Sequence, residues 1–95
     1  MEEINREEVY REKVLIFLKG YDFMRVGQAI SRHQWQAASM TLVRMTKQVR
    51  ELGLETLERP LASLGQAVRY QKEQEAKQIL AGVVARRVAL LQKYT

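Results

Sequence analysis

Apolar residues recur at alternating spacings of three and four along the middle of this chain, and this pattern constrains the fold more than any other feature. The pattern includes Trp35, Ala38, Leu42, Met45, Val49 and Leu52, followed by Leu54, Leu57, Leu61, Leu64 and Val68. Such spacing places apolar side chains on one side of a helix, so two long amphipathic helices are predicted. Gly53 is expected to end the first helix. Because proline is tolerated in a first turn, Pro60 predicts that the second helix begins near Leu57–Arg59, unless it is kinked there.

Three further helices are predicted around this pair. The first covers about residues 4–19 and ends at Gly20, a short one starts with Asp22 as its N-cap, and the last covers about residues 72–94. Their apolar faces contain Tyr10, Val14, Phe17 and Leu18; Phe23, Val26 and Ile30; and Ala76, Leu80, Val83, Val84, Val88 and Leu91. Short connections favour antiparallel neighbours. We therefore predict one all-α domain over residues 1–95, without an internal repeat: an antiparallel up-and-down four-helix bundle with a short additional N-terminal helix.

The residue types narrow the chemistry available to the chain. It contains no Cys and one His among 95 residues. These counts exclude a disulfide scaffold, a Cys-ligated zinc site, a thiol nucleophile and a His-rich metal site. No Ser-His-Asp arrangement or catalytic carboxylate pair is recognisable, so we expect no enzyme, no cofactor and no metal. The first residues are acidic and polar and no long apolar run follows, so we expect a cytoplasmic protein without a signal peptide or membrane span.

The positive charge is unevenly distributed along the chain. The formal net charge is +5, and residues 21–50 supply most of it, with Arg25, Arg32, Arg44, Lys47 and Arg50 against Asp22 alone. A local basic patch suits an acidic protein surface, a nucleic acid or an anionic membrane; the alternative is a solvated helix face. Nucleic acid is disfavoured as a partner because no helix-turn-helix signature is present and the basic residues alternate with uncharged ones. A membrane is disfavoured because the apolar faces are needed for a core.

A Leu-Gly-Leu-x-x-Leu junction covers residues 52–57, with Leu61 and Leu64 after it. Before it, Ala29-Ile30-Ser31-Arg32-His33-Gln34-Trp35 passes through a short turn into the long helix, and Glu75-Ala76-Lys77-Gln78-Ile79-Leu80 lies in the last helix. Together, residues 21–94 resemble a histidine-containing phosphotransfer (HPt) domain of bacterial phosphorelays. Members of that family carry a phosphorylatable His in the pattern H-x-L-K-G-S-A, and alignment on Gly53 places Val43 at its position.

The resemblance implies an HPt-like fold and a role in two-component signalling. Because Val43 has no lone pair, it cannot accept a phosphoryl group. The implied function is therefore non-catalytic binding of a response-regulator receiver domain or a histidine kinase. The alternative is an active phosphotransfer protein that uses His33, ten positions upstream and about 15 Å away along a helix. Otherwise His33 is a surface residue at a helix boundary.

The predicted partner-binding surface lies on the exposed side of the long helix and consists of Met40, Val43, Arg44, Lys47 and Arg50. Two apolar residues among basic ones suit the acidic surface of a receiver domain. The alternative is that the two apolar residues pack under the first helix, because a small bundle needs every apolar contact. A small basic nucleic-acid-binding or structural bundle is the competing class. We expect a monomer or weak dimer, the dimer forming through Val9, Tyr10 and Phe17 if the first helix does not fold back.

Overall fold

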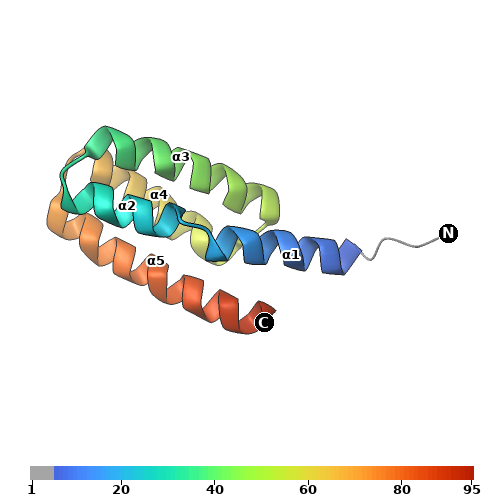
Figure 1. Cartoon of the computed structure of the whole chain (residues 1–95). Helices are drawn as coiled ribbons and strands as arrows, with labels where there is room; N and C mark the ends of the chain where they lie inside the picture. Colours follow the sequence, from blue (N-terminus) through green and yellow to red (C-terminus); the bar gives the residue numbers. More distant parts are fainter. Residues whose placement is uncertain (1–5) are drawn as a thin grey trace.

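The predicted helical segments form, and short turns separate them. The computed structural model describes residues 6–95, and these residues contain five α-helices and no strand. The helices are α1 (Arg6–Lys19), α2 (Asp22–Ser31), α3 (Trp35–Leu52), α4 (Glu55–Arg69) and α5 (Glu73–Tyr94) (Figure 1). The expected start of the first helix, near residue 4, lies outside the described residues. None of the helices over residues 6–95 has the length and hydrophobicity needed to cross a membrane.

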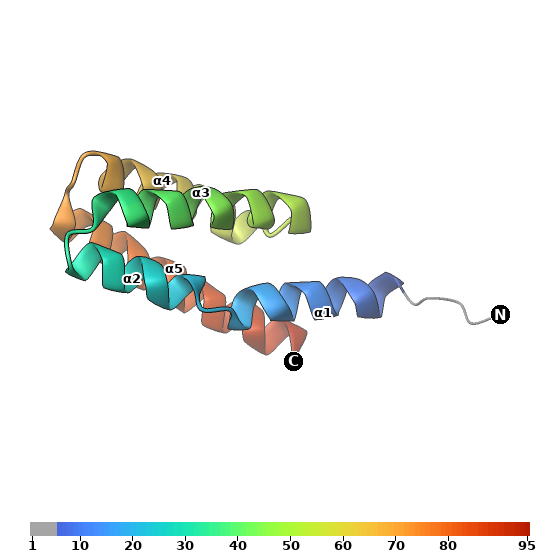
Figure 2. The same cartoon turned by 45° about the horizontal axis from the view of Figure 1, so that its top comes forward.

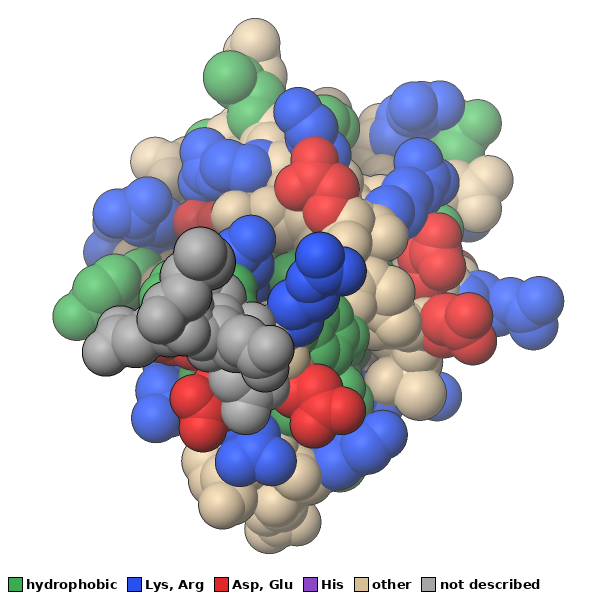
Figure 3. Space-filling view, turned by 90° about the vertical axis from the view of Figure 1, so that its right-hand side faces the viewer, with side chains coloured by type: hydrophobic (Ala, Val, Ile, Leu, Met, Phe, Trp, Pro, Cys, Tyr) green, Lys and Arg blue, Asp and Glu red, His purple; other side chains and the backbone are tan. Residues whose placement is uncertain are grey.

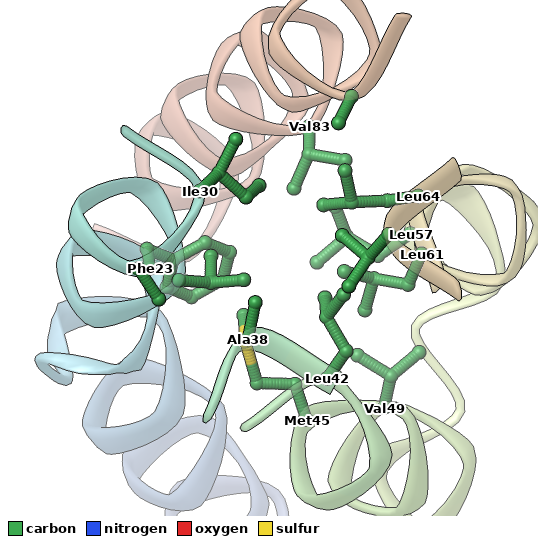
Figure 4. Packing of buried hydrophobic residues seen from close by; sticks show 14 of the residues in the cluster. Phe23, Ile30, Ala38, Leu42, Met45, Val49, Leu57, Leu61, Leu64 and Val83 are labelled. Carbon is green, nitrogen blue, oxygen red and sulfur yellow. The ribbon is translucent and has the colours of Figure 1, made fainter. Parts of the chain in front are cut away.

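The core consists largely of the apolar positions that the spacing singled out, but Val84 and Val88, predicted on the apolar side of the last helix, are 38% and 45% exposed. On α3, Ala38, Leu42, Met45 and Val49 are at most 2% exposed, while Trp35 and Leu52 are half-buried at the two ends. On α4 the expected leucines and Val68 are all buried. Figure 4 shows the four buried side chains of α3 and three leucines of α4 (Leu57, Leu61 and Leu64) converging with Phe23 and Ile30 of α2 and Val83 of α5. The prediction of an all-helical domain with one apolar core is therefore confirmed for the described residues.

Helices α2 to α5 surround this core, and α1 adds Val14, Phe17 and Leu18 to it at its C-terminal end, while its N-terminal end continues beyond the bundle (Figure 1). The α2–α3 and α4–α5 turns lie at one end of the molecule and the α3–α4 turn at the other (Figures 1 and 2). α3 packs against α2 and α4, and α5 packs against α4, α2 and α1. α1 has 14 residues and α2 has ten, so the N-terminal helix is not the short one that we expected.

Three helix ends use the same hydrogen-bonded turn. After α2, α3 and α4 the chain takes a left-handed residue, namely His33 (φ 57°), Gly53 (φ 68°) and Gln71 (φ 55°). The next amide then donates back to a carbonyl five residues earlier, in the pairs Gln34 to Ala29, Leu54 to Val49 and Lys72 to Ala67. This turn satisfies carbonyls that the end of a helix leaves without donors.

Two expected helix boundaries are wrong. Asp22 is the first residue of α2 rather than its N-cap, which is Tyr21, and no side chain caps this end. Helix α4 begins at Glu55 rather than near Leu57–Arg59, so Pro60 lies inside it. The turn at Gly53 explains the early start: Leu54 is buried there, and its carbonyl accepts from the Leu57 amide at 3.0 Å, which begins the helical hydrogen bonding.

The two helical hairpins α2–α3 and α4–α5 match around their turns when one is shifted by 38 residues, although the helices of the second hairpin are longer. Equivalent pairs end the first helix (Ser31 and Arg69), carry the left-handed turn (His33 and Gln71) and begin the second helix (Trp35 and Glu73). The sequence Gly-Gln-Ala occurs at residues 27–29 and again at 65–67. The expectation of no internal repeat is therefore wrong.

Burial follows the same shift. The equivalent buried pairs are Phe23 and Leu61, Val26 and Leu64, Ala29 and Ala67, Ile30 and Val68, Ala38 and Ala76, and Met45 and Val83. Most of these pairs combine different apolar residues, so the two halves share a pattern of burial more than residue identities. The two hairpins thus share most of their buried positions, although Leu42 and Val49 are buried while their equivalents Leu80 and Arg87 are half-buried.

Candidate partner-binding surface on α3 and α4

The outer side of α3 is open. Met40 is 66% exposed and Val43 is 69% exposed, although both are large apolar side chains. Helix α1 does not cover them, because it packs beside α5 and against the end of α3 near Leu52. The alternative that these two residues pack under the first helix is therefore wrong.

Arg44 is turned away from the rest of the predicted surface. Its guanidinium forms two hydrogen bonds with the Asp22 carboxylate of α2, Nη2 to Oδ1 at 2.9 Å and Nε to Oδ2 at 3.3 Å. These hydrogen bonds, together with the charge of Asp22, raise the pKa of Arg44 above its ordinary value. Arg25 also approaches the same carboxylate, at 3.8 Å. Asp22, which we expected to be an N-cap, instead joins α2 to α3. It forms ion pairs with two of the basic residues of the segment 21–50.

Three of the five predicted residues line one groove. Val43, Lys47 and Arg50 lie along the α3 side of a groove of about 630 Å³ between α3 and α4. Arg50 also pairs with Glu58 of α4, Nε to Oε1 at 3.4 Å. Lys47 has no ion pair with any residue of the described chain. Met40 lies outside the groove lining, on the exposed outer face of α3.

The α4 side of the groove was missed by sequence reasoning. Ala62, Gly65, Gln66 and Arg69 line it, opposite the α3 residues. Their spacing of three or four, alongside the buried positions of α4, is the signal that predicts a second face on this helix. Arg69 adds a cation to the groove from outside the basic segment 21–50, and it makes no ion pair within residues 6–95. The described groove thus combines small and apolar residues with three cations, Lys47, Arg50 and Arg69.

The basic side chains do not gather in a single block at the end of the molecule that carries the α3–α4 turn. Figure 3 shows the end that carries the α3–α4 turn, where Lys and Arg side chains are spread around the outline with Asp and Glu between them. Several cations are also paired within the chain, as the contacts of Asp22 and Glu58 show. The charge count of residues 21–50 therefore overstates the basic surface that is open to a partner.

His33 lies at the opposite end of the bundle from the α3–α4 turn. Its Nε2 is 2.6 Å from Oε2 of Glu73 on α5, and its ring stacks on Trp35 with centroids 5.8 Å apart. Glu73 also accepts a hydrogen bond from Lys77 at 2.9 Å. The Lys77 hydrogen bond, followed by that of His33, lowers the pKa of Glu73. His33 is thus at a helix boundary, as one expectation held, and it links the first hairpin to the second.

The aromatic residues of the N-terminal helix make contacts within the molecule, although Tyr10 remains 38% exposed. Phe17 is buried, and the Tyr10 hydroxyl donates to the Leu52 carbonyl at 2.5 Å while its ring meets Tyr94 edge-on at 6.3 Å. Burial, followed by the contact with Tyr94, raises the pKa of Tyr10. Because α1 packs on α5 and α3, the condition we set for a dimer through Val9, Tyr10 and Phe17 is not met in this fold.

The arrangement on α3 and α4 offers binding chemistry. Val43 supplies apolar surface in the wall of the groove, and the cations that line it can meet carboxylates or phosphates. No protein-family model, curated protein or solved structure matches the chain.

Proposed function

We propose that the chain is a non-catalytic protein-interaction module of the HPt type, whose α3 surface binds an acidic receiver domain or a histidine kinase. The proposal takes α2 to α5 as an antiparallel up-and-down bundle in which α3 corresponds to the helix that carries the phosphorylatable His in that family. In such a role it would act in the bacterial cytoplasm, within two-component signalling.

The exposure of Val43 is the observation that carries the proposal. A phosphorylatable His must be reached by a partner protein, so its position on the helix has to be open to solvent. Val43 occupies the position that the resemblance assigns to that His, and it is 69% exposed in the middle of α3. A large apolar side chain in such a place favours contact with a partner rather than with the core.

The charge around this position supports an acidic partner. Lys47 lies one turn further along α3 and is free of ion pairs within the described residues, while Arg50 and Arg69 flank the adjacent groove. The phosphorylation site of a receiver domain is acidic, so cations at this position would both attract and orient it. Arg44 contributes less than we expected, because Asp22 already holds its guanidinium.

Titration with receiver domains tests the proposal. The amide signals of residues 36–50 are expected to shift on addition of the partner, and Lys47→Glu should weaken binding. Lys19→Glu on α1 changes the net charge equally and serves as the control, because it lies on another helix. Receiver and kinase domains that leave the α3 signals unmoved would sink the proposal.

A further inference from the structure

Because the two hairpins are related by the internal repeat, the helix pair α3–α4 has an equivalent helix pair elsewhere in the same molecule. The shift of 38 residues relates α2 to α4 and α3 to α5, so the α3–α4 pair corresponds to the pair α5–α2. Both pairs are in contact in the bundle. Gly65 of α4 then corresponds to Gly27 of α2, and Leu42 of α3 corresponds to Leu80 of α5. The packing of one pair can therefore be compared directly with that of the other.

The two glycines differ in what covers them. A Cβ atom placed on Gly27 would lie 3.3 Å from Cδ2 of Leu80, so a leucine side chain covers this glycine. A Cβ atom placed on Gly65 would have no neighbouring atom within 4 Å. Leu42, the counterpart of Leu80, is only 2% exposed and points into the core, as Figure 4 shows. Gly65 therefore lacks the apolar cover that its counterpart has.

The surroundings of Gly65 indicate the chemistry of what would cover it. Val43 and Ala62 provide apolar walls in the same groove, and Lys47 and Arg69 provide cations that form no ion pair in the part of the chain that the structure describes. Glu51 is the one acidic side chain that lines the groove. An apolar anchor with acidic neighbours matches this combination.

We propose that the α3–α4 groove binds an acidic helix of a partner protein, which places a leucine-sized side chain over Gly65. The partner's carboxylates would lie against Lys47 and Arg69, and the leucine would cover Gly65 as Leu80 covers Gly27. The inference rests on the proposed function of the α3 surface and adds the chemistry of the partner segment. Gly65 is then a specificity-determining residue, because a side chain at this position would occupy the space that the partner needs.

A labelled helical peptide with one central leucine, and with glutamates one turn before and after it, is the probe. Its binding to the full chain is followed by fluorescence anisotropy, beside one peptide with Leu→Ala and one with Glu→Gln. Loss of an aliphatic anchor is expected to weaken binding about tenfold or more. Gly65→Leu in the protein should weaken binding of the leucine peptide by a similar factor. Gly82→Leu is the matched control, because Gly82 is also helical but lines the neighbouring groove between α4 and α5, which shares only Arg50 and Ala62 with the α3–α4 groove.

Each result decides the inference. A Gly65→Leu variant that keeps its helical circular dichroism and still binds the peptide as tightly as the original chain overturns it. Equal loss in Gly82→Leu, or no binding of any peptide by the original chain, also overturns it. If a receiver domain shifts the α3 amide signals and Gly65→Leu leaves that binding unchanged, this inference fails and the proposed function stands. The opposite result is also informative. If peptide binding is lost in Gly65→Leu, but receiver and kinase domains do not shift the amide signals of α3, the proposal of these domains as partners fails and the inference about the groove stands.

Discussion

Arg87 of α5 donates a hydrogen bond from its Nε to the carbonyl oxygen of Leu18, at the end of α1. That carbonyl belongs to the last turn of a helix, where the chain itself supplies no helical donor. The same guanidinium lies 4.9 Å from the ring centroid of Phe23 on α2, and Phe23 meets Phe17 edge-on at 5.4 Å. One side chain from α5 therefore holds the junction between α1 and α2.

Replacing Arg87 is expected to loosen this junction. Arg87→Met keeps the aliphatic part of the side chain but removes the donor to Leu18 and the cation over Phe23. A loss of about 2 kcal/mol in the free energy of unfolding is expected, since hydrogen bonds from charged donors contribute on that order. Urea denaturation measures the loss, and amide hydrogen exchange should accelerate in α1 first. Arg86→Met is the control, and an equal effect there would contradict the assignment.

Gly65 and Gly27 provide a matched pair for a stability prediction. Both lie inside helices, where Ala is favoured over Gly by about 0.5–1 kcal/mol. Gly65→Ala places its methyl group in open space and should stabilise the chain by about that amount. Gly27→Ala meets Cδ2 of Leu80 at 3.3 Å, so it should stabilise less or destabilise. Thermal or urea unfolding of both variants checks the order, and a reversed order would show that the packing around the two glycines is not as described.

The same substitution at Gly53 should have the opposite sign. Gly53 has φ 68°, in the left-handed region that a Cβ atom disfavours by about 1–2 kcal/mol. Gly53→Ala is therefore expected to destabilise the chain by about 1 kcal/mol, although no atom lies near its Cβ position. Denaturant unfolding measures this loss. Because Gly65→Ala is chemically identical, it separates the backbone effect from the effect of adding a methyl group.

Glu73 should contribute stability that is lost in acid. Its pKa in the folded state is lowered from the ordinary value of 4.5, by the hydrogen bond from Lys77 first and that from His33 second. A lowered pKa means that the contribution is fully present above pH 4.5 and disappears as pH falls through the folded value. The difference in unfolding free energy between the original chain and Glu73→Gln should therefore shrink on acidification. Glu75 is the control, because its carboxylate lies 3.8 Å from Lys72 Nζ. Glu75→Gln should change the free energy of unfolding at neutral pH by less than Glu73→Gln does.

Much of the fold follows from spacing, because a period near 3.6 residues fixes which side chains share a helix face. That is why the apolar pattern alone places Leu42 and Leu61 in the core. The start of α4 could not be placed in the same way. Pro60 predicts a late start, but the turn at Gly53 and Leu54 begins the helix earlier. That turn depends on the left-handed backbone conformation of Gly53, which the apolar spacing does not predict.

The candidate site was predictable only in part. The exposure of Val43 follows from the periodicity of α3, since its side chain lies away from the buried positions. The pairing of Arg44 with Asp22 could not be predicted from this periodicity. Asp22 lies 22 residues earlier and meets Arg44 only when α2 packs on α3. Gly65 and Arg69 were missed for a related reason: the spacing on α4 indicates a second face of that helix, but only the packing of α4 against α3 makes this face one side of a groove.

The repeated left-handed turns also bear on how the chain reaches this fold. Each turn at His33, Gly53 and Gln71 closes within six residues, so neighbouring helices are brought together by short-range contacts. Chains dominated by such contacts fold in microseconds to milliseconds. The long-range contacts Tyr10–Tyr94 and Arg87–Leu18 both join α1 to α5. Assembly should therefore proceed from two rapidly formed hairpins, with attachment of α1 to α5 as the step that slows when the Arg87 contact is removed.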